Sequence, residues 1–321
     1  MTRFARLMSV VTATALLVGV CACSSGGPGG SGAGGGSRRV IGVSFYDTTI
    51  PLYATMLEGM QAEAKAENAK LVVANANEDA ATQISQIRSF ITQHVDLIVA
   101  TPLDPKALVP GYQAAKSAHI PIISFGNNMA PQDEDGFVGD NWSALTVEQL
   151  DRVAALLNGH GEIAFLEQAP FLQYVQQMKS GWQSTLARYP GLSVVADLHT
   201  GFTVSESLAS AGTILDSHPD VNAILCETDQ DAAAVAQAIA QRHIPAGKIL
   251  VAGVNGQPIA TDQIEKGYIA LTVAFAPQSW GKKVIATATA YLDGHKPTAP
   301  VTIPYQVVDK TNLASFQSEW K

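Results

Sequence analysis

Carboxylate side chains stand at several points where short aliphatic runs of the sequence end. Asp47, Asp104 and Asp229 each follow such a run closely. Two carboxylates held together could serve as general acid and general base, but nothing in the spacing indicates that any two of these meet. An enzyme therefore remains an unsupported alternative, and we expect no catalytic residue.

Motifs for metals and nucleophiles are missing from the sequence. None of the seven histidines stands at zinc-ligand spacing from another, and there is neither a G-x-S-x-G elbow nor a P-loop. The acidic run 133–135 lacks the alternating ligands of a calcium loop. We interpret it as a solvated loop, with a metal site as the weaker alternative. Cys226 lies in an apolar run and is expected in the core. We expect neither metal nor cofactor.

The N-terminus has the layout of an export signal. Arg3 and Arg6 precede an apolar run at 7–20, as in a signal peptide. The sequence VCACSS that follows resembles the bacterial lipobox, in which the cysteine after the cleavage point is lipidated. The resemblance implies an acyl anchor on Cys23.

This interpretation divides the N-terminal region into two parts. Residues 1–22 are the expected signal peptide. Residues 23–38 comprise the lipidated cysteine and a tether, most of which reads GGPGGSGAGGGS. A chain so rich in glycine and serine is a flexible linker. An ordinary secretory signal cut near Ala22 is the alternative.

Composition limits which classes of protein remain possible. The chain has 321 residues, of which 47% are hydrophobic and 15% charged, and its formal net charge is −8. Its length allows about two domains, and its apolar content excludes disorder. The acidic balance argues against a nucleic-acid partner, since phosphate binding requires clustered Lys and Arg.

From residue 39 onward, aliphatic runs alternate with amphipathic segments. We expect strands at 40–45, 71–74, 97–100, 120–125, 163–166, 193–196, 223–226, 249–254 and 270–274, and helices between them, for example at 56–67, 79–92, 231–241 and 279–292. Near-continuous aliphatic strands are typical of parallel sheets covered on both faces. The pattern predicts an α/β fold with two doubly wound lobes, whose ligand lies beyond the carboxyl ends of the strands.

Several stretches resemble the periplasmic sugar-binding proteins of the ribose-binder type, the receptors of ATP-driven importers. The matching stretches are IGVSFYDTTIPLYATMLEGMQAEA, LIVATPLDPKAL, IPIISFGNN, HPDVNAILCETDQDAAAVAQAI and ILVAGVNGQP. The resemblance covers the chain from Val40 to the C-terminus. It implies two lobes that close on one small molecule and then engage an ABC permease with its ATPase.

The resemblance also implies how the chain divides between the lobes. Hinge strands would cross near Gly139, Phe275 and Ile303. The N-terminal lobe would then comprise 39–139 and 276–303, and the C-terminal lobe 140–275 and 304–321.

Some ligand positions of this family are matched directly. The polar contact after the first strand is matched by Tyr46, and an aromatic after the loop proline by Tyr53, which either stacks on a sugar face or belongs to a helix-start core. Thr101 takes the place of an asparagine, and Phe202 matches an aromatic of the second lobe.

The "N-D" segment of the family reads Thr228-Asp229 here. The asparagine is replaced by Thr228, and Asp229 is retained. Two roles for Asp229 stay open, a ligand contact and a cap of the helix that follows.

Other positions depart from the family. Its Asp-Arg pair is Gly126-Asn127 here, and its helix arginine is Met178. Its loop aspartate is Asn255, and its hinge glutamine is Phe275. Most of the lost groups are charged, and charged groups make the strongest hydrogen bonds.

Two neighbouring residues could replace the lost polar contacts. Asp47 could supply the missing carboxylate, and Gln176 could take over from the arginine. Because no carried-over pocket position is Lys or Arg, we expect a small neutral sugar or polyol and not an anion.

The sequence thus predicts a monomeric, lipid-anchored substrate-binding subunit at the outer face of the cytoplasmic membrane. The alternatives are a receptor for a quorum-type furanose or sensory ligand, and a lipoprotein enzyme.

Overall fold

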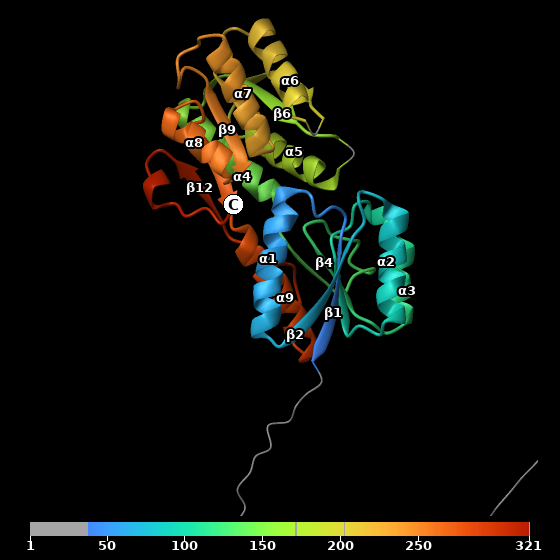
Figure 1. The fold of residues 1–321 in the computed structure, drawn as a ribbon. Coiled ribbons are helices and arrows are strands. Elements are labelled where there is room, and N and C mark those ends of the chain that lie inside the picture. The colour runs from blue at the N-terminus through green and yellow to red at the C-terminus, as the bar shows by residue number, and fades with distance from the viewer. Residues whose placement is uncertain (1–37, 171, 202, 321) are drawn as a thin grey trace, which may run out of the picture. The chain divides into compact units, whose positions relative to one another are not determined.

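The computed structural model describes residues 38–170, 172–201 and 203–320. Its strands form two six-stranded sheets (Figure 1). The first sheet has the order β11 (Val301–Thr302), β5 (Gly136–Gly139), β4 (Ile122–Phe125), β3 (Leu97–Ala100), β1 (Arg39–Phe45) and β2 (Ala69–Asn75). The second has the order β12 (Tyr305–Asp309), β10 (Leu271–Phe275), β9 (Leu250–Asn255), β8 (Ala223–Cys226), β6 (His160–Glu167) and β7 (Gly191–His199).

Strand pairing is parallel throughout the first sheet. The second sheet is parallel except for its edge, where β12 runs antiparallel to β10. Parallel neighbours need long crossovers, and helices supply most of them. The predicted α/β fold with two doubly wound parallel sheets is confirmed.

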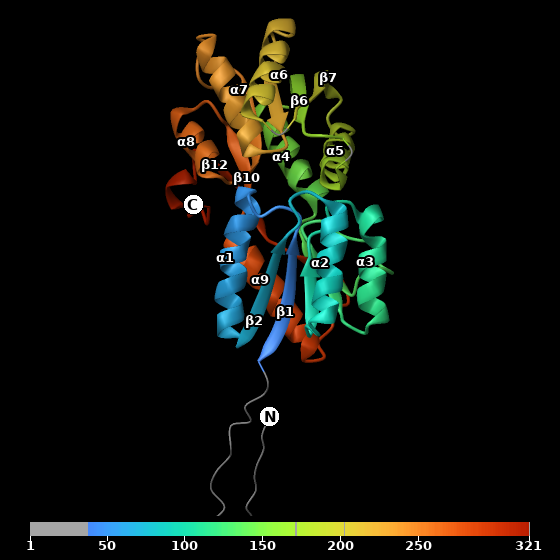
Figure 2. The same cartoon turned by 45° about the vertical axis from the view of Figure 1, so that its right-hand side comes forward.

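Helices cover both faces of the first sheet (Figures 1 and 2). One face carries α1 (Pro51–Ala66) and α9 (Pro277–Leu292), and the other carries α2 (Ala80–Thr92) and α3 (Pro105–Ser117). The backbones of α1 and α9 approach closely at two glycines. A Cβ on Gly281 would lie 1.9 Å from Met56 O, and one on Gly59 would lie 2.0 Å from Gln278 O. Glycine is therefore required at both positions.

The second sheet is covered in the same way. Ile163 and Phe165 pack on the side of α4 (Trp142–Leu156) and α5 (Gln173–Leu186). The alternate residues Ala164 and Leu166 pack on the opposite side. That side carries α6 (Val204–Ser217), α7 (Asp229–Gln241) and α8 (Pro258–Lys266). The alternation is that of a strand buried on both faces.

A buried glutamine fastens α4 to the second sheet. Gln149 Nε2 donates to Cys226 O at 2.9 Å and to Gly253 O at 3.1 Å, and its Oε1 accepts from Trp182 Nε1 at 2.8 Å. These bonds satisfy a fully buried amide. Cys226 is buried, as predicted.

The expected strands are present, β3 and β8 with the expected ends and the others with shifted ends. The apolar pattern did not predict β5, β11 and β12, although the resemblance implied hinge strands near Gly139 and Ile303. Three helices begin earlier than expected: α7 at Asp229, and α1 at Pro51 and α9 at Pro277, each of these two with proline in its first turn. The unpredicted strands are short or lie at sheet edges, where the apolar signal is weak.

The chain passes between the two sheets in three places: from β5 to α4, from β10 to α9 and from β11 to β12. The lobe boundaries expected from the sequence fall in these connections, and we propose the division into lobes on this basis. Among the described residues, no helix is both long and apolar enough to cross a membrane. Cys23 and the proposed signal peptide lie outside the described residues.

Candidate ligand-binding site

Two tyrosines lie at the carboxyl end of β1. Tyr46 follows that strand directly, and Tyr53 lies in the first turn of α1. Their rings meet edge to face with centroids 4.9 Å apart. Tyr53 also packs against Phe45 and Phe125 and is only 5% exposed. Tyr53 therefore belongs to the core at the start of a helix, while half-buried Tyr46 lies outside it.

Thr101 and Gly126 complete this edge of the first sheet. Thr101 follows β3 and is fully buried, and its Oγ1 has no partner with hydrogen-bond geometry among the described residues. Gly126 has a φ of 74°, and a Cβ there would lie 3.2 Å from Thr101 Oγ1 and 3.6 Å from the Tyr53 hydroxyl. The backbone conformation and the close neighbouring atoms both favour glycine at this position. The family that the sequence resembles has an aspartate here, so this chain lacks that carboxylate.

Asn127 is buried beside Gly126. Its Nδ2 donates to Pro102 O at 3.0 Å. The amide therefore holds the loop after β3 against the loop after β4.

Polar groups of the second sheet form a linked chain at the ends of β6 and β8. Gln168 N donates to Glu227 Oε2 at 2.7 Å. Gln168 Oε1 accepts from the Tyr174 hydroxyl. Tyr174 also packs against Trp142, whose Nε1 donates to Gly126 O at the edge of the first sheet. Contacts thus join the carboxyl edges of both sheets in one candidate site.

The Glu227 carboxyl is an unusual group at this edge. It is 1% exposed, and its Oε1 has no hydrogen-bond partner among the described residues. Burial raises the pKa of Glu227 to about 8, and the nearby carboxylates of Glu167 and Asp231 add to the effect. A carboxyl this deeply buried requires an explanation.

Glu167 has a charged partner. Its Oε1 lies 2.9 Å from Lys179 Nζ, which also lies 2.8 Å from Asp197 Oδ2. Burial raises the pKa of Glu167. Because Lys179 is paired with two carboxylates, its positive charge is already neutralised and does not attract an anionic ligand.

Trp142 connects the two sides of the site. Its Nε1 donates to Gly126 O at 3.3 Å. Its ring lies 5.7 Å from that of Tyr174 and 6.1 Å from those of Phe275 and Trp280. The sequence prediction missed this residue, although it is the first residue of the helix after the predicted crossover.

Phe275 and Asn255 end adjacent strands of the second sheet. Phe275 is buried between Trp280 and Trp320, with centroids 5.5 and 6.1 Å away. Asn255 has a φ of 125°, a conformation that is strained for any residue but glycine. Its carbonyl oxygen accepts from Trp320 Nε1 at 2.9 Å. Strain of this kind concentrates at functional sites.

Asp229 is not the cap of the helix that follows it, which was one of the two roles left open by the sequence. It is the first residue of α7, and the helix cap is Thr228, whose hydroxyl accepts from Asp231 N. The fully buried Asp229 carboxylate accepts from Gln257 N and Thr272 Oγ1, both at 2.7 Å. Its hydrogen bonds fix the loop after β9, and burial raises its pKa to about 7.

The remaining predicted residues lie apart from this group or outside the description. The Asp47 oxygens accept from Thr49 N and Oγ1, both at 2.8 Å, within their own loop. Gln176 is exposed and donates to Pro170 O at 3.1 Å. Phe202 lies outside the described residues.

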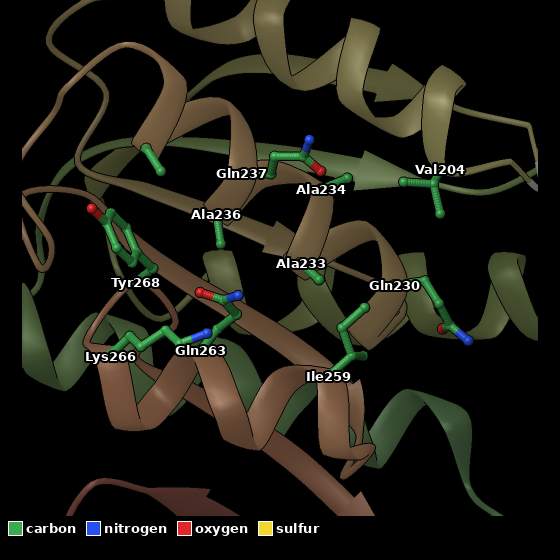
Figure 3. A pocket seen from close by; sticks show the side chains of 11 residues that line it. Val204, Gln230, Ala233, Ala234, Ala236, Gln237, Ile259, Gln263, Lys266 and Tyr268 are labelled. Atoms are coloured by element: carbon green, nitrogen blue, oxygen red, sulfur yellow. The ribbon is translucent and has the colours of Figure 1, made fainter.

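A hollow of about 410 Å³ lies elsewhere, between α7 and α8 (Figure 3). Alanines of α7 and the side chains of Ile259 and Gln263 line it. None of its lining residues is a predicted ligand residue, so it is separate from the site at the strand ends.

Two largely parallel sheets carry aromatic and buried polar side chains at their carboxyl edges, as expected for a protein whose candidate ligand site lies beyond the strand ends. The chain belongs to the periplasmic binding protein domain family, whose model matches residues 41–296. The resemblance to periplasmic sugar-binding proteins is therefore confirmed.

Curated relatives cover most of the chain. The ribose import binding protein of Bacillus subtilis (strain 168) is 26% identical over 272 residues, which are 83% of this chain and 86% of the relative. A xylitol-binding protein of Mycolicibacterium smegmatis is 29% identical over 264 residues, 82% of this chain and 71% of the relative.

Solved structures share the fold. A periplasmic ribose ABC transporter protein of Conexibacter woesei superimposes with a TM-score of 0.81 at 26% identity, covering 88% of this chain and 96% of that one. An ABC transporter solute-binding protein of Bacillus halodurans with bound myo-inositol gives the same TM-score at 24% identity, covering 89% of this chain and 100% of that one.

Proposed function

We propose that this protein is the substrate-binding subunit of an ABC importer and captures a small neutral sugar or polyol. The observation that carries the proposal is the gathering of aromatic rings and buried polar groups at the carboxyl edges of both sheets. Tyr46 and Tyr174 offer rings and hydroxyls, and Trp142 offers an indole ring. Glu227 offers a buried oxygen without a hydrogen-bond partner among the described residues, and Thr101 offers a buried hydroxyl beside Tyr53. Sites of this composition bind small molecules with few, well-placed polar contacts.

The charge of the site supports a neutral ligand. Glu167, Glu227 and Asp229 are all buried on the side of the second sheet. The nearby cation Lys179 is already paired with Glu167 and Asp197. Among the described residues at this edge, a phosphate or carboxylate on the ligand would find buried carboxyl groups and no unpaired cation to compensate its charge.

The cellular setting of the proposal follows from the N-terminal sequence and the family. An acyl chain on Cys23 would hold the protein at the outer face of the cytoplasmic membrane, beside the permease and ATPase. The relatives named above for ribose import and xylitol binding support the transport role.

A ligand screen tests the proposal. The purified protein is heated alone and with D-ribose, D-allose, xylitol, myo-inositol or D-arabinose, and binding is then measured by calorimetry. A ligand at 100 times its Kd stabilises the folded state by about 2.7 kcal/mol, which raises Tm by several degrees. The absence of a shift with every neutral sugar and polyol, together with a shift with a sugar acid or phosphate, would contradict it. Product formation from any of these compounds would favour an enzyme.

A further inference from the structure

We propose that Glu227 is a specificity-determining residue that hydrogen-bonds a hydroxyl group of the ligand through its Oε1. This rests on the proposed function and deepens it, because it names the chemical group that the second sheet recognises. The sequence resemblance did not assign a role to this position.

The first support is the state of the Glu227 side chain. One carboxyl oxygen is held by Gln168 N at 2.7 Å, which fixes the orientation of the group. The other oxygen is buried without a partner among the described residues. A buried polar atom without a hydrogen-bond partner is unfavourable, and a ligand hydroxyl would supply the missing partner.

The second support is the position of Glu227. It directly follows β8, a central strand of the second sheet, at the edge where parallel sheets bind ligands. Tyr174, joined to Glu227 through Gln168, packs against the ring of Trp142 with centroids 5.7 Å apart. Trp142 Nε1 in turn donates to Gly126 O at 3.3 Å. These contacts link the Glu227 carboxyl to the carboxyl edge of the first sheet.

The third support is that other unpartnered polar atoms lie at the same edges. Buried oxygens without a hydrogen-bond partner among the described residues include Thr101 Oγ1 after β3 and Gln173 Oε1 at the start of α5. A polyhydroxylated ligand can satisfy several such atoms at once. By contrast, the neighbouring buried Asp231 accepts from Ser207 Oγ and Thr228 Oγ1, both at 2.6 Å. Asp231 therefore has no need of a ligand.

The groups around Glu227 make its protonation sensitive to binding. Glu167 from β6 and Asp231 from α7 disfavour the charged form of Glu227. Lys179 from α5 favours the charged form. The Tyr174 hydroxyl, also from α5, interacts with Glu227 as well. Burial raises the pKa of Glu227 to about 8. A new hydrogen bond to its carboxyl group would shift this pKa, so the affinity would depend on pH near 8.

The experiment compares wild type, Glu227→Gln, Glu227→Ala and the control Asp231→Asn. The probe is whichever of D-ribose, D-allose, xylitol and myo-inositol binds wild type most tightly by calorimetry. We expect Glu227→Ala to weaken binding by about 10- to 100-fold and Asp231→Asn to leave it within a few-fold. We also expect the affinity of wild type to change between pH 6.5 and 9, and that of Glu227→Gln to stay nearly constant.

The outcomes separate the two proposals. Unchanged affinity in Glu227→Ala, or an equal loss in Asp231→Asn, overturns the role of Glu227 and leaves the proposed function standing. The same pH dependence in Glu227→Gln as in wild type also overturns it. If wild type binds no neutral sugar or polyol and does bind a sugar acid or phosphate, both proposals fail together. Circular dichroism of each variant distinguishes lost contact from lost folding.

Discussion

The indole nitrogen of Trp142 donates a hydrogen bond to the carbonyl oxygen of Gly126 over 3.3 Å. This bond joins the first residue of α4, which packs on the second sheet, to the loop after β4 of the first sheet. A single side chain thus connects the two edges that carry the proposed ligand contacts.

Trp142→Phe removes this bond and keeps most of the ring packing. We expect ligand affinity to fall by about 3- to 10-fold, since one hydrogen bond contributes about 0.5–1.5 kcal/mol. Calorimetry with the best-binding sugar measures the change. Trp182→Phe is the matched control, because it also loses one buried indole bond, at 2.8 Å to Gln149, but within the core. Equal effects of the two substitutions on affinity would contradict the linking role.

Tyr46→Phe tests the first-sheet edge. Burial raises the pKa of the Tyr46 hydroxyl, which also interacts with Tyr53, and the ring is half-buried. We expect affinity to fall by about 2- to 10-fold while Tm changes little. The control is Tyr189→Phe, whose hydroxyl donates to Asp151 Oδ1 at 2.9 Å away from the site. If only the control weakens binding, Tyr46 does not contact ligand.

Asn255→Gly separates strain from recognition. Glycine relieves the φ of 125°, a strain of about 1–3 kcal/mol, but it adds freedom to the unfolded chain. We expect the free energy of unfolding to rise slightly and the affinity to fall, because the predicted ligand amide is lost. Urea unfolding and calorimetry measure the two effects. Asn158→Gly, at a φ of 54°, is the control for strain alone. An unchanged affinity would remove Asn255 from the set of ligand contacts.

Asp140 predicts a pH dependence of stability. Both of its carboxylate oxygens are buried without a partner among the described residues, and burial raises its pKa to about 8. The unfolded value is about 3.9, so the folded state holds the proton more tightly. The contribution of this group is complete below about pH 4 and is lost as the pH rises towards 8.

Asp140→Asn removes the loss of stability at high pH, because an amide does not ionise. We expect the variant to be more stable than wild type at pH 8 by at least about 1 kcal/mol and to gain less at pH 5. Urea unfolding at both pH values measures the difference. An identical change in stability at pH 5 and pH 8 would show that ionisation of Asp140 is not responsible.

The sequence by itself determined the alternation of strands and helices, and with it the fold class. Aliphatic runs such as 97–100 and 223–226 are the strands β3 and β8 with the predicted ends, because burial on both faces leaves a continuous apolar signal. The family motifs also placed Tyr46, Thr101 and Asn127 at strand ends.

Only the tertiary structure decided which side chains meet there. Asp229 is a well-matched family position, yet its carboxylate is used by Gln257 and Thr272, which are distant in sequence. The resemblance assigned no role to Glu227 or Trp142, and their importance lies in an unpaired oxygen and in a bond to Gly126. Hydrogen-bond partners depend on the register of neighbouring strands and on loop conformation, and spacing along one chain specifies neither.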